Sequence, residues 1–390
     1  MIPAVMPTYG RWDVAVDRGE GLYLHATDGR KFLDFTSGIG VTGLGHCHPH
    51  VVAAVTEQAK GLWHTSNMFR IPGQERLAQR LVDNTFADTV FFGNSGAEAC
   101  ELAIKIARKY QSETGHPERY RIIGCHGSFH GRTFATLAAA GNEAYLKGFG
   151  PPMDGFDQVA FGNLNEMRAA IGKETGAIMV EPIQGEGGVR AAPEDYLRGL
   201  REIADEFGLL LVYDEVQCGM GRTGKLFAHE WEGVAPDVMA IAKALGNGFP
   251  VGACLSSERA AVGMTAGSHG STFGGNPLAM AAGNAVLDMM LEPGFFERVD
   301  AAAKLLRGRL QALVESYPKL FAELRGAGLL LGIRCVVPAA DFVTRLRQNG
   351  LLCLTAGENV LRILPPLIVG EREIDEALEV MNKVAREWPA

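Results

Sequence analysis

The middle of the chain alternates short apolar runs with segments of helical periodicity, and this alternation limits the available folds most strongly. Each run has the length of a strand and leads into a loop or a helical pattern. The five runs are TVFFGNSG from Thr89, RIIGCHGSF from Arg121, GAIMVEPI from Gly176, LLLVYDEV from Leu209 and DVMAIAKA from Asp237. Continuous apolar runs belong to strands that are covered on both faces, so the pattern predicts β/α units around a mostly parallel sheet.

Two of the intervening segments have clear helical periodicity. AEACELAIKIARKY places Leu102, Ile106 and Tyr110 on one stripe, with charged residues elsewhere on the surface of the helix. EDYLRGLREIADEFG repeats the pattern and ends at Gly208, a residue type that commonly terminates helices. Both segments are therefore expected to cover the predicted sheet.

The pattern changes towards the end of the chain. A long helical segment runs from Pro277 to the break at Pro293, and a charged helix follows around residues 304–313. GAGLLLGIRCVV and LRILPPLIV then have the character of strands, which predicts a smaller α+β domain. The N-terminal segment contains GLYLHATDGRKFLDFTSG, a hairpin-like stretch that we expect to join this smaller domain.

These observations predict a division of the chain into three parts. Residues 1–45 would join the small domain, residues 46–285 would form the large domain, and residues 286–390 would form the C-terminal α+β domain. A chain of 390 residues is long enough for two such domains.

Composition excludes several classes of partner. A net charge of −8 argues against nonspecific binding to nucleic acid or anionic lipid, because either needs a dense basic patch. The N-terminus lacks a basic start followed by an apolar run, and no segment approaches about 18 uncharged apolar residues. The seven cysteines are scattered without a C-x-x-C pair, which favours reduced thiols. We expect a cytoplasmic protein with small-molecule partners, no nucleic acid and no membrane.

Lys243 is the only charged side chain between Val238 and Leu255. Such a lysine often lays its stem on apolar surface while its ammonium reaches water. Alternatively, a desolvated pocket lowers the pKa of the amine and makes it a nucleophile towards carbonyl groups. This stretch alone leaves both interpretations open.

Two further segments supply candidate site residues at strand ends. NSGAEA follows a predicted strand and opens a helix, where backbone N–H groups bind anions, although Ser95 also suits an ordinary helix cap. Asp214 ends another apolar strand, where ligands of open α/β sheets collect, although it could simply be structural. Together with Lys243, these segments provide the groups that pyridoxal phosphate requires: an amine, a carboxylate for the pyridine nitrogen, and amides for the phosphate.

Six motifs, in this order and spacing, resemble the class III pyridoxal-phosphate aminotransferases of fold type I. They are NSGAEA, FHGRT, EPIQGEGG, DEVQCGMGRTG, AIAKALGNGFPVGA and STFGGNPLA. The resemblance implies an α/β fold: a large domain with a mostly parallel seven-stranded sheet flanked by helices, and a smaller α+β domain built from both chain ends. It also implies a homodimer with shared active sites and pyridoxal 5'-phosphate as cofactor.

The resemblance further assigns roles at the cofactor. Lys243 would form the Schiff base and then move the proton, Asp214 would pair with the pyridinium nitrogen, Gln217 would lie near the phenolic oxygen, and Phe129 would stack on the ring. Thr272 would contact the phosphate of the neighbouring subunit. The complete set of implied cofactor residues is Ser95, Gly96, Ala97, Phe129, Asp214, Glu215, Val216, Gln217, Lys243 and Thr272.

The substrate residues follow from the same resemblance. Arg132 would bind the α-carboxylate of the amino donor, with Ser271 nearby, and Arg362 would bind that of glutamate or 2-oxoglutarate. Glu186 would neutralise Arg362 when no such carboxylate is present. We interpret Glu181 as structural support for the Glu186 loop.

Within the family, the compact length and SGIGVTGLGHCHP most resemble the members that act on acetylornithine. Residues 37–45 lack the aromatic side chain that meets a free α-amine in ornithine-specific members, which favours an acylated donor. Succinylornithine, succinyldiaminopimelate, ornithine and 4-aminobutyrate remain alternative donors.

The sequence disfavours three other classes of function. The donors of GHCHPH, residues 46–50, suit zinc, but no second ligand cluster occurs at zinc-finger spacing, so we expect no metal there and place Pro49 at a helix start. A non-catalytic member of the fold should lack the lysine, the aspartate or the arginines, all of which are present. A racemase, aminomutase or decarboxylase is disfavoured by the two arginines and the glutamate, through the resemblance alone.

Overall fold

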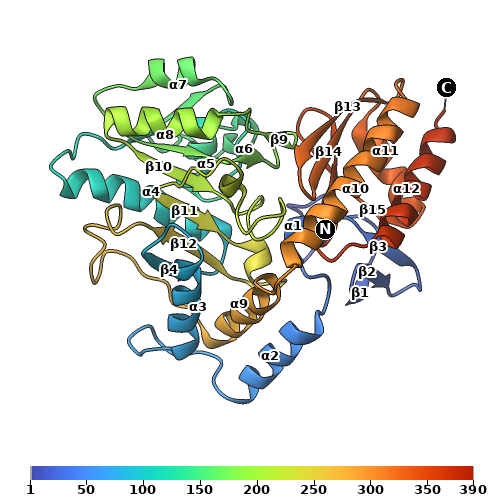
Figure 1. Ribbon diagram of the computed structural model, residues 1–390, viewed down its shortest axis with the longest axis horizontal. Helices are drawn as coiled ribbons and strands as arrows, with labels where there is room; N and C mark the ends of the chain where they lie inside the picture. The colour runs from blue at the N-terminus through green and yellow to red at the C-terminus, as the bar shows by residue number, and fades with distance from the viewer. Residues whose placement is uncertain (1, 390) are drawn as a thin grey trace.

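A seven-stranded sheet forms the centre of the larger lobe in the computed structural model, which describes residues 2–389 (Figure 1). The strand order is β4-β12-β11-β10-β7-β5-β6, and only β12 runs antiparallel to its neighbours. The strands are β4 (Thr89–Gly93), β5 (Arg121–Cys125), β6 (Phe156–Val159), β7 (Thr175–Val180), β10 (Leu210–Asp214), β11 (Val238–Ile241) and β12 (Gly252–Ser256). The predicted α/β class and all five predicted strands are confirmed.

Helices cover both faces of this sheet (Figure 1). On β10, Leu210 and Val212 pack in one apolar cluster with α4, whereas Leu211 and Tyr213 pack in another with α8. This two-sided burial explains why the strand sequence is continuously apolar. The helices of this lobe are α2 (Pro49–Lys60), α3 (Pro72–Asp83), α4 (Gly96–Glu113), α5 (Phe134–Ala140), α6 (Glu143–Leu146), α7 (Leu164–Ala170), α8 (Tyr196–Phe207) and α9 (Pro277–Met290).

Several helix ends are set by the residues that the sequence singled out. Ser95 caps α4, and its hydroxyl oxygen accepts a hydrogen bond from the backbone N–H of Glu98. Gly208 ends α8 in the left-handed conformation, with φ of 65°, as the predicted stop requires. Pro49 is the first residue of α2, as predicted, and His48 is the residue before it.

The smaller lobe holds two four-stranded sheets. One has the order β13-β14-β17-β16 and the other β1-β2-β3-β15, in which β15 runs parallel to β3 and thereby joins the two ends of the chain. The predicted N-terminal hairpin is formed by β2 and β3. The elements are β1 (Val16–Glu20), β2 (Tyr23–Ala26), β3 (Lys31–Asp34), β13 (Phe321–Ala327), β14 (Leu330–Cys335), β15 (Leu351–Leu352), β16 (Leu354–Ala356), β17 (Val360–Ile363), α10 (Phe295–Ser316), α11 (Ala339–Gln348) and α12 (Glu371–Arg386).

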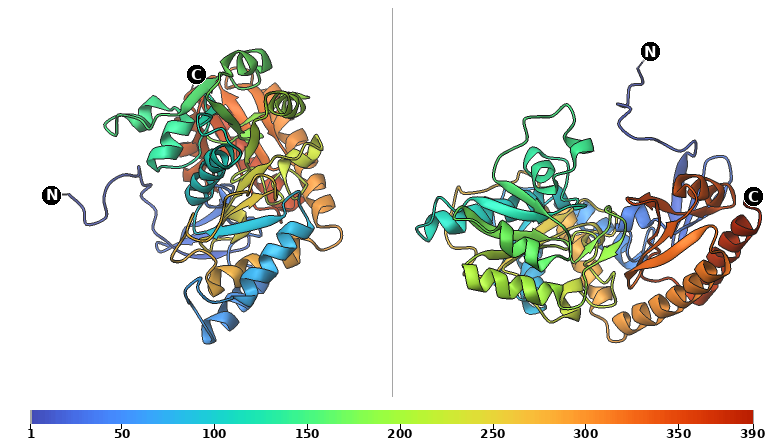
Figure 2. Two further views of the ribbon diagram at one scale, coloured as in Figure 1. Left: turned by 90° about the vertical axis from the view of Figure 1, so that its left-hand side faces the viewer. Right: turned by 90° about the horizontal axis from the view of Figure 1, so that it is seen from above.

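Short elements complete the chain. Figure 2 shows the first residues as an extended trace that leads away from both lobes. None of the helices within residues 2–389 combines the length and apolarity needed to cross a bilayer. The remaining elements are α1 (Ser37–Gly40), the hairpin of β8 (Ile183–Gln184) and β9 (Arg190–Ala191), and the 3-10 turns η1 (Ala228–Trp231) and η2 (Lys243–Leu245).

Candidate active site

A cavity of 490 Å³ lies beyond the carboxyl ends of the parallel strands. Asp214 is the last residue of β10, and Lys243 follows β11 by two positions. Open α/β sheets collect ligands at this edge. The predicted residues that line the cavity are Ser95, Gly96, Ala97, Phe129, Arg132, Glu186, Asp214, Val216, Gln217 and Lys243.

One wall of the cavity is the beginning of α4. Gly96 and Ala97 are its first two residues, so their backbone N–H groups have no partner within the helix and face the N-terminal end. The backbone is closely packed there: a Cβ on Gly96 would lie 2.7 Å from Val216 Cγ1, and a Cβ on Gly252 would lie 2.3 Å from the Ser95 carbonyl oxygen. An anion fits this wall better than a bulky side chain does.

The carboxylate of Asp214 is buried and fixed by three donors. Its Oδ1 accepts a hydrogen bond from the Val216 N–H at 2.9 Å, and its Oδ2 accepts from His130 Nδ1 at 2.7 Å and from Cys100 Sγ at 3.3 Å. Burial opposes protonation of His130, but the hydrogen bond and charge of Asp214 raise the histidine pKa above its ordinary value. The aspartate is therefore held in one orientation, with a partner that favours its ionised form.

Lys243 begins η2 with φ of +47°, a left-handed conformation that is unusual for a residue with a side chain. Burial lowers the pKa of its amine to about 8, although the negative charge of Glu186 acts in the opposite direction. A substantial share of the amine is consequently neutral near physiological pH and available as a nucleophile. These features favour the reactive interpretation of the lysine over the surface-lying one.

Glu181 supports two segments that border the cavity. Its carboxyl oxygens accept hydrogen bonds from the N–H groups of Phe129 at 2.8 Å and Gly185 at 3.3 Å. Burial, together with the charge of Asp214, raises the pKa of Glu181 to about 8. The structural role that the sequence suggested for Glu181, support of the Glu186 loop, is confirmed by its contact with Gly185.

Arg362 lies behind the wall of the cavity: it does not line the 490 Å³ space itself but contacts Glu186 and Gln217, which do. It lies on β17, is 2% exposed, and donates from Nη1 to Glu186 Oε1 and, at 3.2 Å, to Gln217 Oε1. Burial raises the pKa of Glu186, but the charge and hydrogen bond of Arg362 outweigh it and bring that pKa below its ordinary value. The pair is thus ionised and closed in this structure.

Arg132 lines the cavity and is exposed. Its guanidinium stacks on the ring of Tyr145, 3.7 Å from the ring centroid, and is 5.6 Å from that of Phe129. Stacking fixes the plane of the guanidinium while its N–H edge stays available to a carboxylate.

Besides Arg362, three predicted residues do not line the 490 Å³ cavity. The Glu215 carboxylate is fully buried, where it accepts hydrogen bonds from the N–H of Ala228 at 2.6 Å and the N–H of His229 at 2.9 Å. Ser271 accepts from Asn94 Nδ2 at 3.2 Å and lines a separate cavity of 340 Å³, and Thr272 is exposed. None of these three side chains lines the cavity within the single chain, although Ser271 contacts its lining residue Asn94.

The main residues that sequence reasoning missed are the partners of Asp214. His130 and Cys100 contact its carboxylate, yet neither was singled out. His130 stands next to Phe129 inside FHGRT, so its place in that motif was an available signal. No local pattern marks Cys100, which reaches the site from the buried side of α4.

The histidines of GHCHPH do not come together as a metal site, and the side chains that do lie at metal-ligand distances belong to another part of the chain. His46 and His50 turn to separate carboxylates, Asp34 at 2.8 Å and Asp288 at 2.9 Å. Within residues 2–389, the group with metal-ligand geometry is instead Cys100, His130 and Asp214, whose ligand atoms lie within 4.8 Å of one another. The hydrogen bonds among those three side chains account for this proximity.

The α/β sheet, the anion-binding helix start, the fixed carboxylate and the lysine of lowered pKa together define a pyridoxal-phosphate enzyme of fold type I. Comparison with known families agrees: the model of the class-III aminotransferases matches residues 5–385. The chain belongs to this family and is a pyridoxal-phosphate-dependent transaminase.

Individual relatives are similar over almost their whole length. The acetylornithine aminotransferase of Mesorhizobium japonicum is 58% identical, across 98% of this chain and 96% of the relative. That of Brucella melitensis is 58% identical, across 95% and 92%. Among solved structures, the N-acetylornithine aminotransferase of Stenotrophomonas maltophilia has a TM-score of 0.85 and 38% identity, covering 97% of each chain. The ornithine aminotransferase of Toxoplasma gondii has 0.94 and 30%, covering 98% and 92%.

Proposed function

We propose that this enzyme transfers the δ-amino group of N2-acetyl-L-ornithine to 2-oxoglutarate. The products are N-acetyl-L-glutamate 5-semialdehyde and L-glutamate, a step suited to arginine biosynthesis. The observation that carries the proposal is the 58% identity to acetylornithine aminotransferases over nearly the full length of both chains. Two arginines support it, because both substrates carry an α-carboxylate: Arg132 lines the cavity, and Arg362 bonds the lining residue Glu186.

The proposed cofactor contacts follow from the cavity. Ser95, Gly96 and Ala97 would hold the phosphate at the start of α4, and Asp214 would hold the pyridine nitrogen. When bound, pyridoxal phosphate supplies an electron sink for the carbon that loses its proton. The further proposed contacts are Phe129 on the ring face, with Val216 and Gln217 near the ring edge.

Lys243 is the proposed base. Its amine would take the proton from Cδ of acetylornithine in one half-reaction and return a proton to Cα of the nascent glutamate in the other. The lowered pKa suits this task, because a base with a pKa of about 8 is partly neutral at the working pH and still accepts a proton readily.

The two arginines would bind the α-carboxylates of the two substrates, one in each half-reaction. Arg132 would bind the α-carboxylate of acetylornithine while the Arg362–Glu186 pair stays closed, because a free buried guanidinium is costly. The α-carboxylate of 2-oxoglutarate would then replace Glu186 on Arg362. Glu186 is the more accessible partner, with 29% of its side chain exposed against 3% for Arg362, so it is the partner that would move.

An acylated donor fits the side of the cavity formed by the N-terminal segment. Val41 lines the cavity there, and residues 37–45 contain no aromatic side chain to meet a free α-amine. Ornithine is the second candidate donor, favoured by the likeness to the Toxoplasma gondii ornithine aminotransferase. Succinylornithine, succinyldiaminopimelate and 4-aminobutyrate are the remaining alternatives.

We also propose a homodimer with shared active sites. Thr272 and Phe273 are exposed and lie outside the chain's own cavity. Thr272 would therefore contact the phosphate held by a neighbouring subunit, and Ser271 precedes it in the sequence. Exposed apolar side chains at Trp63, Met68 and Phe69 provide surface for such an interface.

Two coarser proposals concern the chain as a whole. The large, cofactor-binding domain would span residues 46–285, with residues 1–45 and 286–390 in the small domain; the outer limits at 1 and 390 lie outside the described residues. A reducing compartment, the cytoplasm, is proposed because all seven cysteines are free.

A donor panel tests the proposed reaction. With 2-oxoglutarate as acceptor, kcat/KM should be highest for N-acetylornithine among acetylornithine, succinylornithine, ornithine, succinyldiaminopimelate and 4-aminobutyrate. A higher kcat/KM for ornithine or 4-aminobutyrate would refute the assignment. A higher value for succinylornithine would show that the preferred donor carries a succinyl group in place of the acetyl group.

A further inference from the structure

A second cavity, of 540 Å³, adjoins the first and shares Phe129 and Glu186 with it as lining residues. Glu186 therefore stands at the boundary between the two spaces. The polar groups of the second cavity come from the Phe129 loop, α6 and its cap, the β8–β9 hairpin, β16 and the turn after β16. They are His126, Ser128, Asn142, Tyr145, Arg190, Thr355 and Glu358.

The backbone at Glu186 is held in place by the smaller lobe. The Gly357 N–H donates to the Glu186 carbonyl oxygen at 2.8 Å. The contact is too close for side chains: a Cβ on Gly187 would lie 2.3 Å from the Gly127 carbonyl oxygen, and a Cβ on Gly357 would lie 3.0 Å from that of Glu186. This packing favours rotation of the Glu186 side chain over movement of its loop as the way in which Glu186 leaves Arg362.

Rotation has to place a charged carboxylate somewhere. The contact with Arg362 keeps the pKa of Glu186 below its ordinary value despite burial, so the carboxylate is ionised while it bonds Arg362. The first cavity is occupied by the substrate in that state. Away from Arg362, burial raises this pKa, so a second cation within reach would stabilise the carboxylate in its ionised form.

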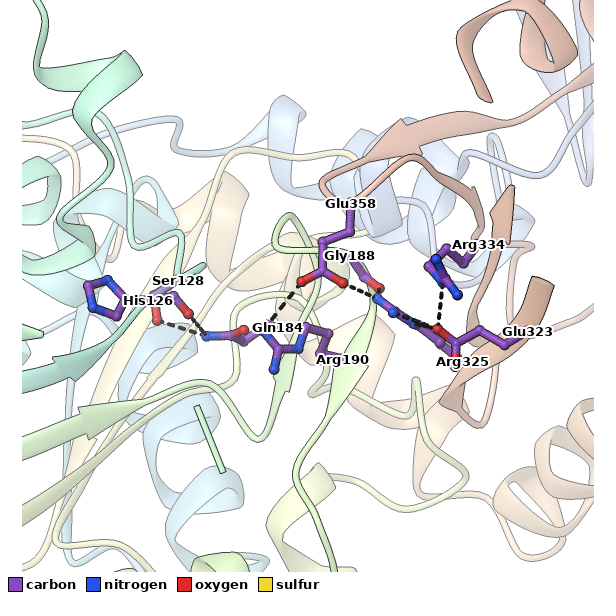
Figure 3. Close-up of polar contacts among 9 residues, drawn as sticks. All are labelled: His126, Ser128, Gln184, Gly188, Arg190, Glu323, Arg325, Arg334 and Glu358. Carbon is purple, nitrogen blue, oxygen red and sulfur yellow. Dashed lines mark hydrogen bonds and ion pairs between the residues drawn. The ribbon is translucent and has the colours of Figure 1, made fainter. Parts of the chain in front are cut away.

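Arg190 is a cation suited to this purpose (Figure 3). It pairs with Gln184 across the β8–β9 hairpin, and the connection between these two residues contains Glu186. Its present ion pair is loose, with Arg190 Nη1 3.5 Å from Glu358 Oε1, and 37% of its side chain is exposed. Glu358 has a second, closer partner in Arg325, so Arg190 can turn away without leaving Glu358 unpaired.

We propose that the second cavity receives the Glu186 carboxylate when a substrate carboxylate binds Arg362, and that Arg190 is its ion-pair partner there. Arg190 is then a positioning residue, selective for the half-reaction of glutamate and 2-oxoglutarate. The inference rests on the proposed exchange at Arg362.

The chain offers a closely matched control. Arg168 is 46% exposed, pairs with Glu206 and lies over the ring of Phe207 at 5.6 Å, whereas Arg190 lies over that of Phe161 at 5.7 Å. Arg190→Gln should lower kcat/KM for glutamate roughly tenfold in single-turnover absorbance measurements, while the value for acetylornithine stays within about twofold. Arg168→Gln should leave both values unchanged.

Binding provides a readout that does not depend on turnover. Glutarate, a dicarboxylate without an amino group, should raise the Tm of wild-type protein and of Arg168→Gln more than that of Arg190→Gln. In a Glu186→Ala background, Arg190→Gln should no longer change the glutamate half-reaction, because no carboxylate then needs the second cavity.

Three results would overturn the proposal. They are an equal loss in both half-reactions of Arg190→Gln, the same selective loss in Glu358→Gln, or an undiminished effect of Arg190→Gln in the Glu186→Ala background. The second result would mean that Arg190→Gln acts by breaking the existing Arg190–Glu358 ion pair and not by depriving Glu186 of a partner. The glutamate and glutarate measurements need no acetylornithine, so failure of acetylornithine as donor would refute the proposed function and leave the glutarate and Glu186→Ala arms of this test intact.

Discussion

His130 Nδ1 and Asp214 Oδ2 lie 2.7 Å apart in a contact that is closed to solvent. The histidine follows Phe129 directly, so one short segment borders the cavity with its aromatic ring and fixes the carboxylate with its imidazole. The orientation of Asp214 and the placing of Phe129 are therefore coupled through the backbone between them.

Asp214→Asn tests the charge of this carboxylate. The amide keeps the size of the side chain but not its negative charge, so it should stabilise the protonated pyridine nitrogen far less. We expect kcat to fall by roughly 100-fold or more. The neighbouring Glu215→Gln is the control: its carboxylate bonds Ala228 and His229 outside the cavity, so it should lower Tm with a small effect on kcat. Similar losses of kcat in both variants would contradict this account.

The lowered pKa of Lys243 predicts a pH profile for cofactor capture. Only the neutral amine attacks the aldehyde, so the rate for cofactor-free protein should rise with pH and level off above about 8, whereas an ordinary lysine continues to about 10.4. Because the charge of Glu186 raises this pKa, Glu186→Gln should shift the profile to lower pH. Stopped-flow absorbance measures both effects, and a rise that continues to pH 10 would refute the assignment.

Gly187→Ala tests the close packing under the Glu186 loop. The added Cβ would meet the Gly127 carbonyl oxygen at 2.3 Å, so the free energy of unfolding should fall by about 1–3 kcal/mol. Gly172→Ala is the matched control, since nothing lies within 4 Å of its Cβ position. Thermal or urea unfolding compares the two. Equal stabilities would mean that the loop is not held as tightly as these contacts indicate.

Glu186→Ala tests the exchange at Arg362. Without the carboxylate, Arg362 should bind α-carboxylates in both half-reactions, so kcat/KM for glutamate should rise relative to that for acetylornithine. The ratio of the two values in single-turnover experiments is the measurement. An unchanged ratio would show that Glu186 does not control access to Arg362.

The central strands could be predicted from the sequence because a strand that is buried on both faces is a continuous run of apolar residues. Two strands, β6 and β12, were not among the predicted runs. The sequence of β6 is FDQV, which contains polar residues. β12 runs antiparallel to β11, and hydrophobic periodicity does not record the direction of a strand. Strand direction and order depend on packing between distant segments, which local patterns do not record.

The site was predictable to the extent that its residues lie in local motifs. Lys243, Asp214 and the start of α4 are marked by strand ends and small residues. The side-chain direction of Glu215 and the contact of Cys100 with Asp214 depend on tertiary packing. The second cavity could not be predicted from local motifs, because its lining residues come from segments far apart in the chain, from His126 to Glu358.

The central claim is that Lys243 is the residue that holds the cofactor and carries the proton. Borohydride reduction of the pyridoxal-phosphate-loaded protein, followed by peptide mass mapping, should locate the pyridoxyl group on Lys243, and Lys243→Ala should be colourless and unable to transaminate. A label on another lysine, or a colourless Lys243→Ala protein that still transaminates, would contradict the account.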